Sequence, residues 1–337
     1  VGFCTNDKNR KEFIHYSFFF VLCCFTRPIL CQSPKETLEG DSSDCQQEQQ
    51  HSTRKKNMSQ EEESVKSARD AFTNDSAFMV AYERALETEK GDEALIKDIF
   101  AAKMCGDKGK DLSDSFGAQA APAFGLWPDF HKTWTVVRTK FIDDTLSATL
   151  GDGHCGIWQF LNLGAGLDTR VFRLPLASSF EAAFEVDMEE INNPKKGLFK
   201  ALGMEPLCSK HSLVSTDLKK KGELEKELTC AGFDPKKKSI IVAEGLIMYL
   251  GEAQQMFLEE VSSLAAPGSV FILNFMDVPK EHGLPKDEIQ KVMESGGWEN
   301  LKFNQFGDEV LNYGRFNSDY EPSKSFSFIV AQKTQEQ

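Results

Sequence analysis

The spacing of apolar residues predicts helices in the first folded part of the chain. From residue 75, apolar side chains recur at intervals of three and four residues, as expected for one face of a helix, and the pattern continues to about Met104. The apolar positions that extend it beyond residue 90 are Leu95, Ile96, Ile99 and Phe100. A further helix is expected from about Phe130 to Leu150.

After Gly151 the pattern changes to alternating strands and helices. Short apolar runs predict strands at 157–163, 182–186, 212–215, 239–243 and 269–275, and longer amphipathic stretches predict helices at 189–202, 222–231 and 252–265. A last strand at 325–331 alternates polar and apolar residues. Alternation of this kind indicates a parallel sheet with helices on both faces. We therefore expect a doubly wound, mostly parallel α/β sheet of the Rossmann-like type.

The first 57 residues differ from the rest. They contain an apolar, Phe-rich run at 18–25, preceded by Lys8, Arg10 and Lys11, and end in a polar tract. One interpretation is a signal or transit segment; another is a non-native leader upstream of a natural start at Met58. We expect residues 1–57 to be unstructured or non-native, 58–150 to form a helical N-terminal cover and 151–337 to form the core.

Composition narrows the class of protein. The chain has 337 residues, of which 40% are hydrophobic, with 39 Lys and Arg against 52 Asp and Glu and a net charge of −13. Nucleic acids and anionic membranes need a cationic surface, so we expect neither as a partner. No apolar run reaches the roughly 18 residues of a membrane span. The nine cysteines show neither a C-x-x-C nor zinc-ligand spacing, so we expect no metal and a cytoplasmic protein with reduced thiols.

The strongest local signal is the loop Gly164-Ala165-Gly166 directly after the first predicted strand of the sheet. Glycines are required where the backbone bends sharply or where a ligand approaches it closely. A tight turn without a ligand is the alternative. Asp187, at the end of the next predicted strand, lies about twenty residues further on, where an acid can accept hydrogen bonds from both hydroxyls of a ribose. Loop and acid together predict a nucleoside site.

The nature of the nucleoside depends on Thr169. The dinucleotide fingerprint G-x-G-x-x-G has a glycine at this position. Because this chain has Thr169 there instead, the sequence argues against NAD binding. S-adenosylmethionine has an adenosine but no pyrophosphate, and it fits the loop better. An NAD-dependent oxidoreductase remains the alternative.

The segment 164–170, Gly-Ala-Gly-Leu-Asp-Thr-Arg, resembles the signature of the leucine carboxyl methyltransferase-like family of S-adenosylmethionine-dependent methyltransferases. Further blocks similar to this family follow in the same order, at 77–87, 137–144, 184–187, 215–218, 232–235 and 243–250. The resemblance covers about residues 75 to 275. It implies a class I methyltransferase fold with an N-terminal helical lid.

The resemblance also implies roles for individual residues. Gly164, Ala165 and Gly166 would border S-adenosylmethionine, with Asp187 on its ribose. Asp217 would accept a hydrogen bond from the adenine amine and Leu218 would pack on the ring. Arg138 would bind the carboxylate of the methionine tail or of a substrate, Glu244 would lie near the amino group and sulfonium, and Tyr249 would touch the substrate.

Simpler interpretations exist for several of these residues. Asp217 is also a suitable N-cap for a following helix. Arg138 could pair with a surface carboxylate, and Tyr249 could be a buried tyrosine with one satisfied hydroxyl. Asp168 and Arg170 are expected to pair within the loop.

Methyl transfer from a sulfonium is an in-line displacement, so the protein mainly has to align the reactants and exclude water. A carboxylate acceptor needs no deprotonation, whereas a hydroxyl needs a general base. The sequence shows no clear base, which favours an acidic acceptor slightly. The resemblance implies an O-methyltransferase acting on a small-molecule acceptor. A non-catalytic protein that retains the fold is a further alternative.

Overall fold

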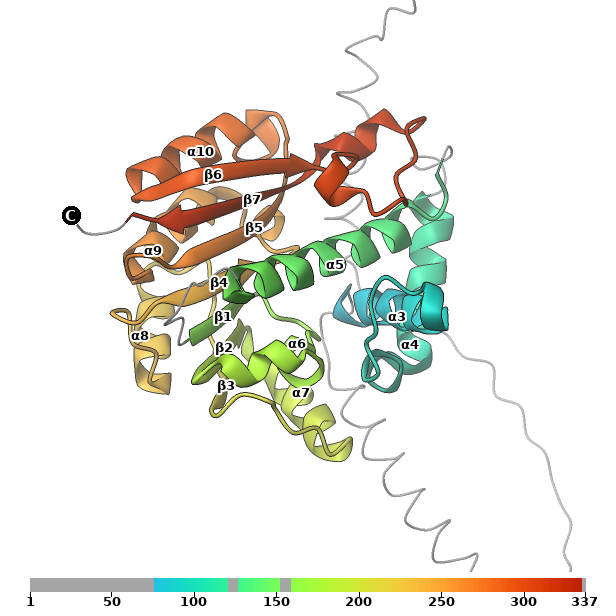
Figure 1. The fold of residues 1–337 in the computed structure, drawn as a ribbon, viewed down its shortest axis with the longest axis horizontal. Helices are drawn as coiled ribbons and strands as arrows, with labels where there is room; N and C mark the ends of the chain where they lie inside the picture. The colour runs from blue at the N-terminus through green and yellow to red at the C-terminus, as the bar shows by residue number, and fades with distance from the viewer. Residues whose placement is uncertain (1–75, 121–126, 152–158, 335–337) are drawn as a thin grey trace, which may run out of the picture.

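The computed structural model describes residues 76–120, 127–151 and 159–334, and its centre is a seven-stranded sheet (Figure 1). The strand order is β3-β2-β1-β4-β5-β7-β6. The strands are β1 Gln159–Leu163, β2 Ala182–Asp187, β3 His211–Ser215, β4 Ser239–Ala243, β5 Val270–Met276, β6 Trp298–Gln305 and β7 Phe326–Lys333. Strands β1 to β5 are parallel, whereas β7 runs antiparallel to both β5 and β6. The predicted doubly wound, mostly parallel sheet is therefore confirmed.

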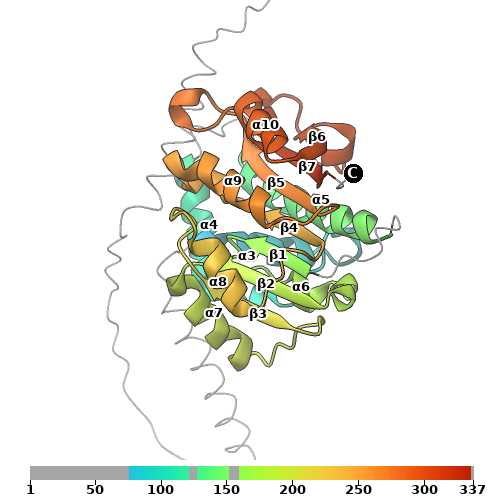
Figure 2. The same ribbon diagram turned by 90° about the vertical axis from the view of Figure 1, so that its left-hand side faces the viewer.

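Helices cover both faces of this sheet. The helices are α3 Ser76–Thr88, α4 Ala101–Ala120, α5 Phe130–Gly151, α6 Arg170–Arg173, α7 Glu189–Ala201, α8 Glu223–Ala231, α9 Gln254–Leu264 and α10 Lys286–Ser295. Figure 2 shows α8 and α9 on the face opposite to α5. Strand β4 contributes apolar side chains to both faces of the sheet. Ile240 and Val242 pack into the core beneath α5, and Ile241 packs into the core beneath α8 and α9. Burial on both faces explains the unbroken apolar runs of the parallel strands.

The prediction of helical structure from 75 to 104 is wrong between Thr88 and Ala101. Helix α3 ends at Thr88, a 3-10 turn covers Gly91–Glu93, and α4 begins only at Ala101. Gly91, in the turn that follows the helix, has φ +63°, an angle that a continuous helix does not contain, and Ile99 is 67% exposed although its spacing suggested burial. Asp98 Oδ1 accepts hydrogen bonds from the backbone N–H groups of Phe100 and Ala101, and this caps the start of α4.

Three further elements were not predicted, namely most of α4, helix α10 and strand β6. The predicted strand at 157–163 is described only from Gln159, and the predicted leader 1–57 lies outside the described residues. The domain limits of 58–150 and 151–337 remain predictions. In the part of the chain that the structure describes, no helix is both long and apolar enough to cross a membrane.

Candidate active site

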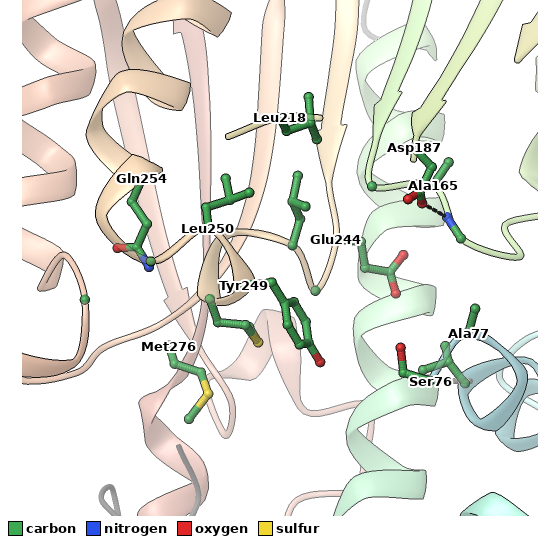
Figure 3. Close-up of a pocket in the computed structure, with 18 of the residues that line it drawn as sticks. Ser76, Ala77, Ala165, Asp187, Leu218, Glu244, Tyr249, Leu250, Gln254 and Met276 are labelled. Atoms are coloured by element: carbon green, nitrogen blue, oxygen red, sulfur yellow. Dashed lines mark hydrogen bonds between the residues drawn. The ribbon is translucent and has the colours of Figure 1, made fainter. Parts of the chain in front are cut away.

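A large cavity, of about 1030 Å³, lies at the carboxyl ends of the parallel strands (Figure 3). All nine residues singled out from the sequence line it. They are Arg138, Gly164, Ala165, Gly166, Asp187, Asp217, Leu218, Glu244 and Tyr249. The carboxyl ends of parallel strands are where ligands bind in open α/β sheets, so the fold itself gathers these residues.

The glycine loop is held tightly against β2. Gly164 and Gly166 have φ angles of +67° and +44°, which side chains rarely adopt. A Cβ atom at Gly164 would also come within 2.9 Å of Leu246 Cδ1. The backbone N–H of Gly164 donates to the carbonyl of Val186 at 2.8 Å. The loop therefore needs glycine for its own conformation, and its bare backbone forms one wall of the cavity.

Asp187 is fixed in place by two backbone hydrogen bonds. Its Oδ2 accepts from the N–H of Gly166 at 2.8 Å, the bond dashed in Figure 3, and its Oδ1 accepts from the N–H of Met188, also at 2.8 Å. Burial raises the pKa of Asp187, and the two N–H donors offset only part of this effect. Each carboxylate oxygen can accept a second hydrogen bond. Asp187 is thus positioned to accept from two neighbouring hydroxyls.

A chain of buried charges lies beside the loop. Arg138 Nε donates to Glu244 Oε1 at 2.8 Å, and Arg170 Nη1 donates to Glu244 Oε2 at 2.7 Å. Arg170 also pairs with Asp168, as the sequence predicted, and with Asp143 at 2.8 Å. Burial alone would raise the pKa of Glu244, but Arg170 and Arg138 outweigh it and lower the pKa. Glu244 is therefore held as a carboxylate.

Arg138 uses only part of its guanidinium in this network. Its Nη1 and Nη2 atoms have no hydrogen-bond partner within the ranges that the structure describes, and the residue lines the cavity. A planar guanidinium with two such nitrogens fits a carboxylate. The alternative of an ordinary surface pair is wrong, because Arg138 and Glu244 have side-chain exposures of only 11% and 13%.

Asp217 does not cap the following helix. The residue before α8 is Gly222, and Asp217 Oδ1 instead accepts from the N–H of Lys219 at 3.0 Å in a local turn. The N-cap interpretation is therefore wrong. Leu218 is buried and lines the cavity next to Asp217.

Tyr249 ends the short 3-10 helix Ile247–Tyr249, and its ring lies among the cavity side chains in Figure 3. Burial raises the pKa of Tyr249 to about 12, although the positive charge of Arg138 acts in the opposite direction. Its hydroxyl is therefore protonated at neutral pH, so it can donate a hydrogen bond but is a poor general base.

Two polar residues that sequence reasoning missed also line the cavity. Asn162 Nδ2 and Thr216 Oγ1 are buried and have no hydrogen-bond partner among the residues described. Asn162 comes just before the glycine loop and Thr216 just before Asp217, so their positions were the available signal. Buried polar groups are normally paired. Together with the free nitrogens of Arg138 and the carboxylate of Asp187, they fit a polar ligand such as a nucleoside with an amino-acid tail.

The segment after the glycine loop does not suit a dinucleotide. Helix α6 has only four residues, whereas a pyrophosphate site uses the N-terminus of a full helix. Thr169 is 1% exposed, and its Oγ1 donates to Asp98 Oδ2 at 2.7 Å. Within residues 76–120, 127–151 and 159–334 no group of His, Cys, Asp and Glu side chains could hold a metal ion.

Fold and site define a class I, Rossmann-like methyltransferase domain. Residues 77–261 match the family described as leucine carboxyl methyltransferase. This is more than half of the chain, and the protein belongs to that family. The resemblance seen in the sequence is thereby confirmed.

Several relatives from mycobacteria are similar to this chain. A protein of Mycobacterium bovis (strain BCG / Pasteur 1173P2), named "Putative S-adenosyl-L-methionine-dependent methyltransferase", is 36% identical over 208 residues, which is 60% of this chain and 65% of that protein. The match thus spans just under two thirds of that relative's length. A relative of the same name from Mycobacterium sp. (strain KMS) is 30% identical over 238 residues, 68% of this chain and 77% of its own.

Solved structures support the fold. A DUF574 family protein from Streptomyces avermitilis has a TM-score of 0.53 at 13% sequence identity, and the match covers 77% of this chain and 97% of that one. At this identity the likeness concerns the fold alone.

Proposed function

We propose that this protein is an S-adenosylmethionine-dependent O-methyltransferase that acts on a small-molecule or carboxylate acceptor by in-line methyl transfer. The observation that carries the proposal is the position of Asp187, tied to the N–H of Gly166 at the edge of the 1030 Å³ cavity. A carboxylate beside a glycine loop at the end of the second strand suits the two hydroxyls of a ribose. The names of the mycobacterial relatives support the methyltransferase part of the proposal and its donor, since both are called S-adenosylmethionine-dependent methyltransferases.

The other cavity residues have complementary roles in this proposal. Asp217 and Leu218 hold the adenine, one by a hydrogen bond and the other by apolar contact. The free Nη atoms of Arg138 bind the carboxylate of the methionine tail, and Glu244 lies near its amino group. Arg138 and Glu244 carry opposite charges side by side. The site therefore offers a cation to the carboxylate of the zwitterionic tail and an anion to its amino group.

The donor supplies an activated methyl group on a sulfonium, so the protein does not have to generate an electrophile. The residues of the chain bind, orient and exclude water. Tyr249 stays protonated at neutral pH and donates a hydrogen bond to the acceptor. We place the protein in the cytoplasm, a proposal supported by Cys105, Cys208 and Cys230, which are thiols and not members of disulfides.

Isothermal titration calorimetry of the purified full chain with S-adenosylmethionine tests the proposal. We expect saturable binding of one equivalent, and no binding at millimolar ligand would refute it. A parallel fluorescence titration with NADH separates the oxidoreductase alternative, for which the nicotinamide would bind and the sulfonium would not. Binding without turnover on any acceptor would instead indicate a non-catalytic relative.

A further inference from the structure

The wall of the cavity formed by the N-terminal helices contains a histidine–carboxylate pair that the proposed function does not use. His131, in the first turn of α5, lines the cavity, and its Nδ1 lies 2.9 Å from both carboxylate oxygens of Glu83 on α3. The N-terminal end of α5 lies beside α3 and α4 (Figure 1). The two residues are 48 positions apart, so only the packing of these helices brings them together.

Glu83 is built to remain ionised. It is 2% exposed, and besides the contact with His131 it accepts from Thr135 Oγ1 at 2.6 Å and from Ser113 Oγ at 3.3 Å. Burial would raise the pKa of Glu83, but His131, Thr135 and the charge of Arg138 outweigh it, so the pKa is lowered. A buried carboxylate with this many donors is a strong acceptor for an imidazole N–H.

The pairing fixes the tautomer of the imidazole. With Nδ1–H donated to Glu83, the proton-accepting nitrogen is Nε2, which has no hydrogen-bond partner in the ranges described. The ring of Phe116, from α4, packs against the imidazole with centroids 4.7 Å apart. The charged residue from another helix that contacts His131 is Glu83, on α3. Close to His131 along the chain, Lys132 and Asp129 pair with one another at 3.6 Å and do not line the cavity.

His131 and Arg138 face the same cavity from one helix. They are separated by seven residues, two helical turns, which corresponds to about 10.5 Å along the axis. Aromatic and methionine side chains also line this cavity, namely Met79, Phe116, Phe130, Trp134, Met276 and Phe326. The ring of Phe116 packs directly against His131, so this lining suits a compound with an apolar, aromatic-sized body.

We propose that His131, oriented by Glu83, is the general base for a hydroxyl acceptor carried on an apolar, aromatic-sized body. The inference rests on the proposed function and narrows its acceptor to an alcohol or phenol. The hydroxyl oxygen forms the new O–CH₃ bond as the S–CH₃ bond of the sulfonium donor breaks. The bonding pair stays on sulfur, and the hydroxyl proton passes to His131 Nε2. Glu83 stabilises the resulting imidazolium, which then releases its proton to solvent.

Two matched probes test the inference, 2-naphthol and 2-naphthoic acid, which share the ring system but differ in whether the oxygen must lose a proton. Turnover with S-adenosylmethionine is compared in the wild type, H131Q, E83Q and the control K132Q. We expect the wild type to methylate 2-naphthol, H131Q to lose about 10²- to 10⁴-fold in kcat and E83Q to lose less. K132Q, on the same helical turn but outside the cavity lining, should match the wild type.

The pH profile distinguishes a base from a merely structural residue. The residual 2-naphthol rate of H131Q should rise with pH as the phenolate forms in solution, whereas the wild-type rate should depend less steeply on pH because His131 accepts the proton from the bound phenol. Calorimetry with S-adenosylmethionine should give the same affinity in wild type and H131Q within about twofold. Absence of donor binding in the wild type would refute the proposed function, whereas normal donor binding with unchanged kcat in H131Q would refute only the role of His131.

A second readout needs no methyl donor. In ¹⁵N NMR spectra of the full chain, the neutral imidazole of His131 should carry its proton on Nδ1 rather than on Nε2, and addition of 2-naphthol should shift the Nε2 signal. The opposite tautomer, or an Nε2 signal that neither probe shifts, would overturn the inference. Methylation of 2-naphthoic acid alone by a wild type that binds the donor would overturn it as well.

Discussion

Arg138 and Glu244, 106 positions apart in the sequence, form an ion pair with a 2.8 Å contact between Nε and Oε1 inside the cavity. The pair joins helix α5 to the end of β4, and Arg170 joins the same carboxylate to the glycine loop. Glu244 thereby holds the guanidinium of Arg138 by one edge and leaves its two terminal nitrogens for a ligand. The same side chains thus join the helix to the sheet and, in our proposal, bind the ligand.

This relationship predicts that lysine cannot replace Arg138. R138K keeps the positive charge but loses the planar pair of donors, so the affinity for S-adenosylmethionine should fall about tenfold to a hundredfold, the effect of losing a hydrogen bond to a charged group. Isothermal titration calorimetry measures this affinity. The control is K140Q, since Lys140 lies on the same helix but pairs with Asp144. Equal affinities in R138K and K140Q would remove Arg138 from the binding site.

Replacement of Asp187 should weaken donor binding without unfolding the protein. D187A removes the acceptor for the proposed ribose hydroxyls, and we expect a loss of about 1–3 kcal/mol in binding free energy. The exposed Glu190 in the next helix offers the control E190A. Equilibrium titrations of the two variants should differ by at least about fivefold, and identical curves would contradict the assignment.

The glycine loop should not tolerate a side chain at its first position. G164A forces alanine to φ +67° and places its Cβ within 2.9 Å of Leu246 Cδ1, so the free energy of unfolding should fall by about 1–2 kcal/mol or more. In α4, a Cβ added at Gly117 would meet no atom within 4 Å, so G117A should be neutral or slightly stabilising. Urea denaturation compares the two, and a stable G164A variant would show that the loop adopts another conformation.

The buried carboxylates predict a loss of stability in acid. The pKa values of Glu83, Asp98, Asp168 and Glu244 all lie below the ordinary values of 4.5 for Glu and 3.8 for Asp, because their ion-pair and hydrogen-bond partners outweigh burial. The unfolded chain therefore takes up protons first as the pH falls.

The stabilising contribution of these groups is complete above about pH 4.5 and is lost as the pH falls through the lowered folded-state pKa values. Asp187, whose pKa is raised, acts in the opposite direction but is a single group. Urea denaturation at pH 7, 5, 4 and 3 should give a free energy of unfolding that declines most steeply below pH 5. A value that stays constant or rises towards pH 3 would contradict the network.

The parallel core and the nucleotide-type loop could be predicted because their signals are local. Buried strands such as Ser239–Ala243 are continuous apolar runs, and the loop at Gly164 and Gly166 requires glycine for its own backbone angles. Strand β6 escaped prediction because most of its side chains are exposed or half-buried at the edge of the sheet. The break after α3 was missed because the apolar spacing resumes at Leu95, although the helix already ends at Thr88, before the turn that contains Gly91.

Several candidate site residues follow directly after strands of the sheet, whereas the pairing of Glu83 with His131 depends on the packing of helices. Asp187, Asp217 and Glu244 follow directly from the strand pattern. The pairing of Glu83 with His131 does not, because Glu83 lies on a helix where its spacing looks like any solvent-facing charge. Only the packing of two helices brings together the proposed base and its orienting carboxylate.

A crystal structure of the full chain with S-adenosylhomocysteine tests the central claim most directly. Both carboxylate oxygens of Asp187 should lie within about 3 Å of the ribose hydroxyls, with the tail carboxylate on the Nη atoms of Arg138. The ligand bound elsewhere, or the carboxylate of Asp187 turned away from the sugar, would contradict this account.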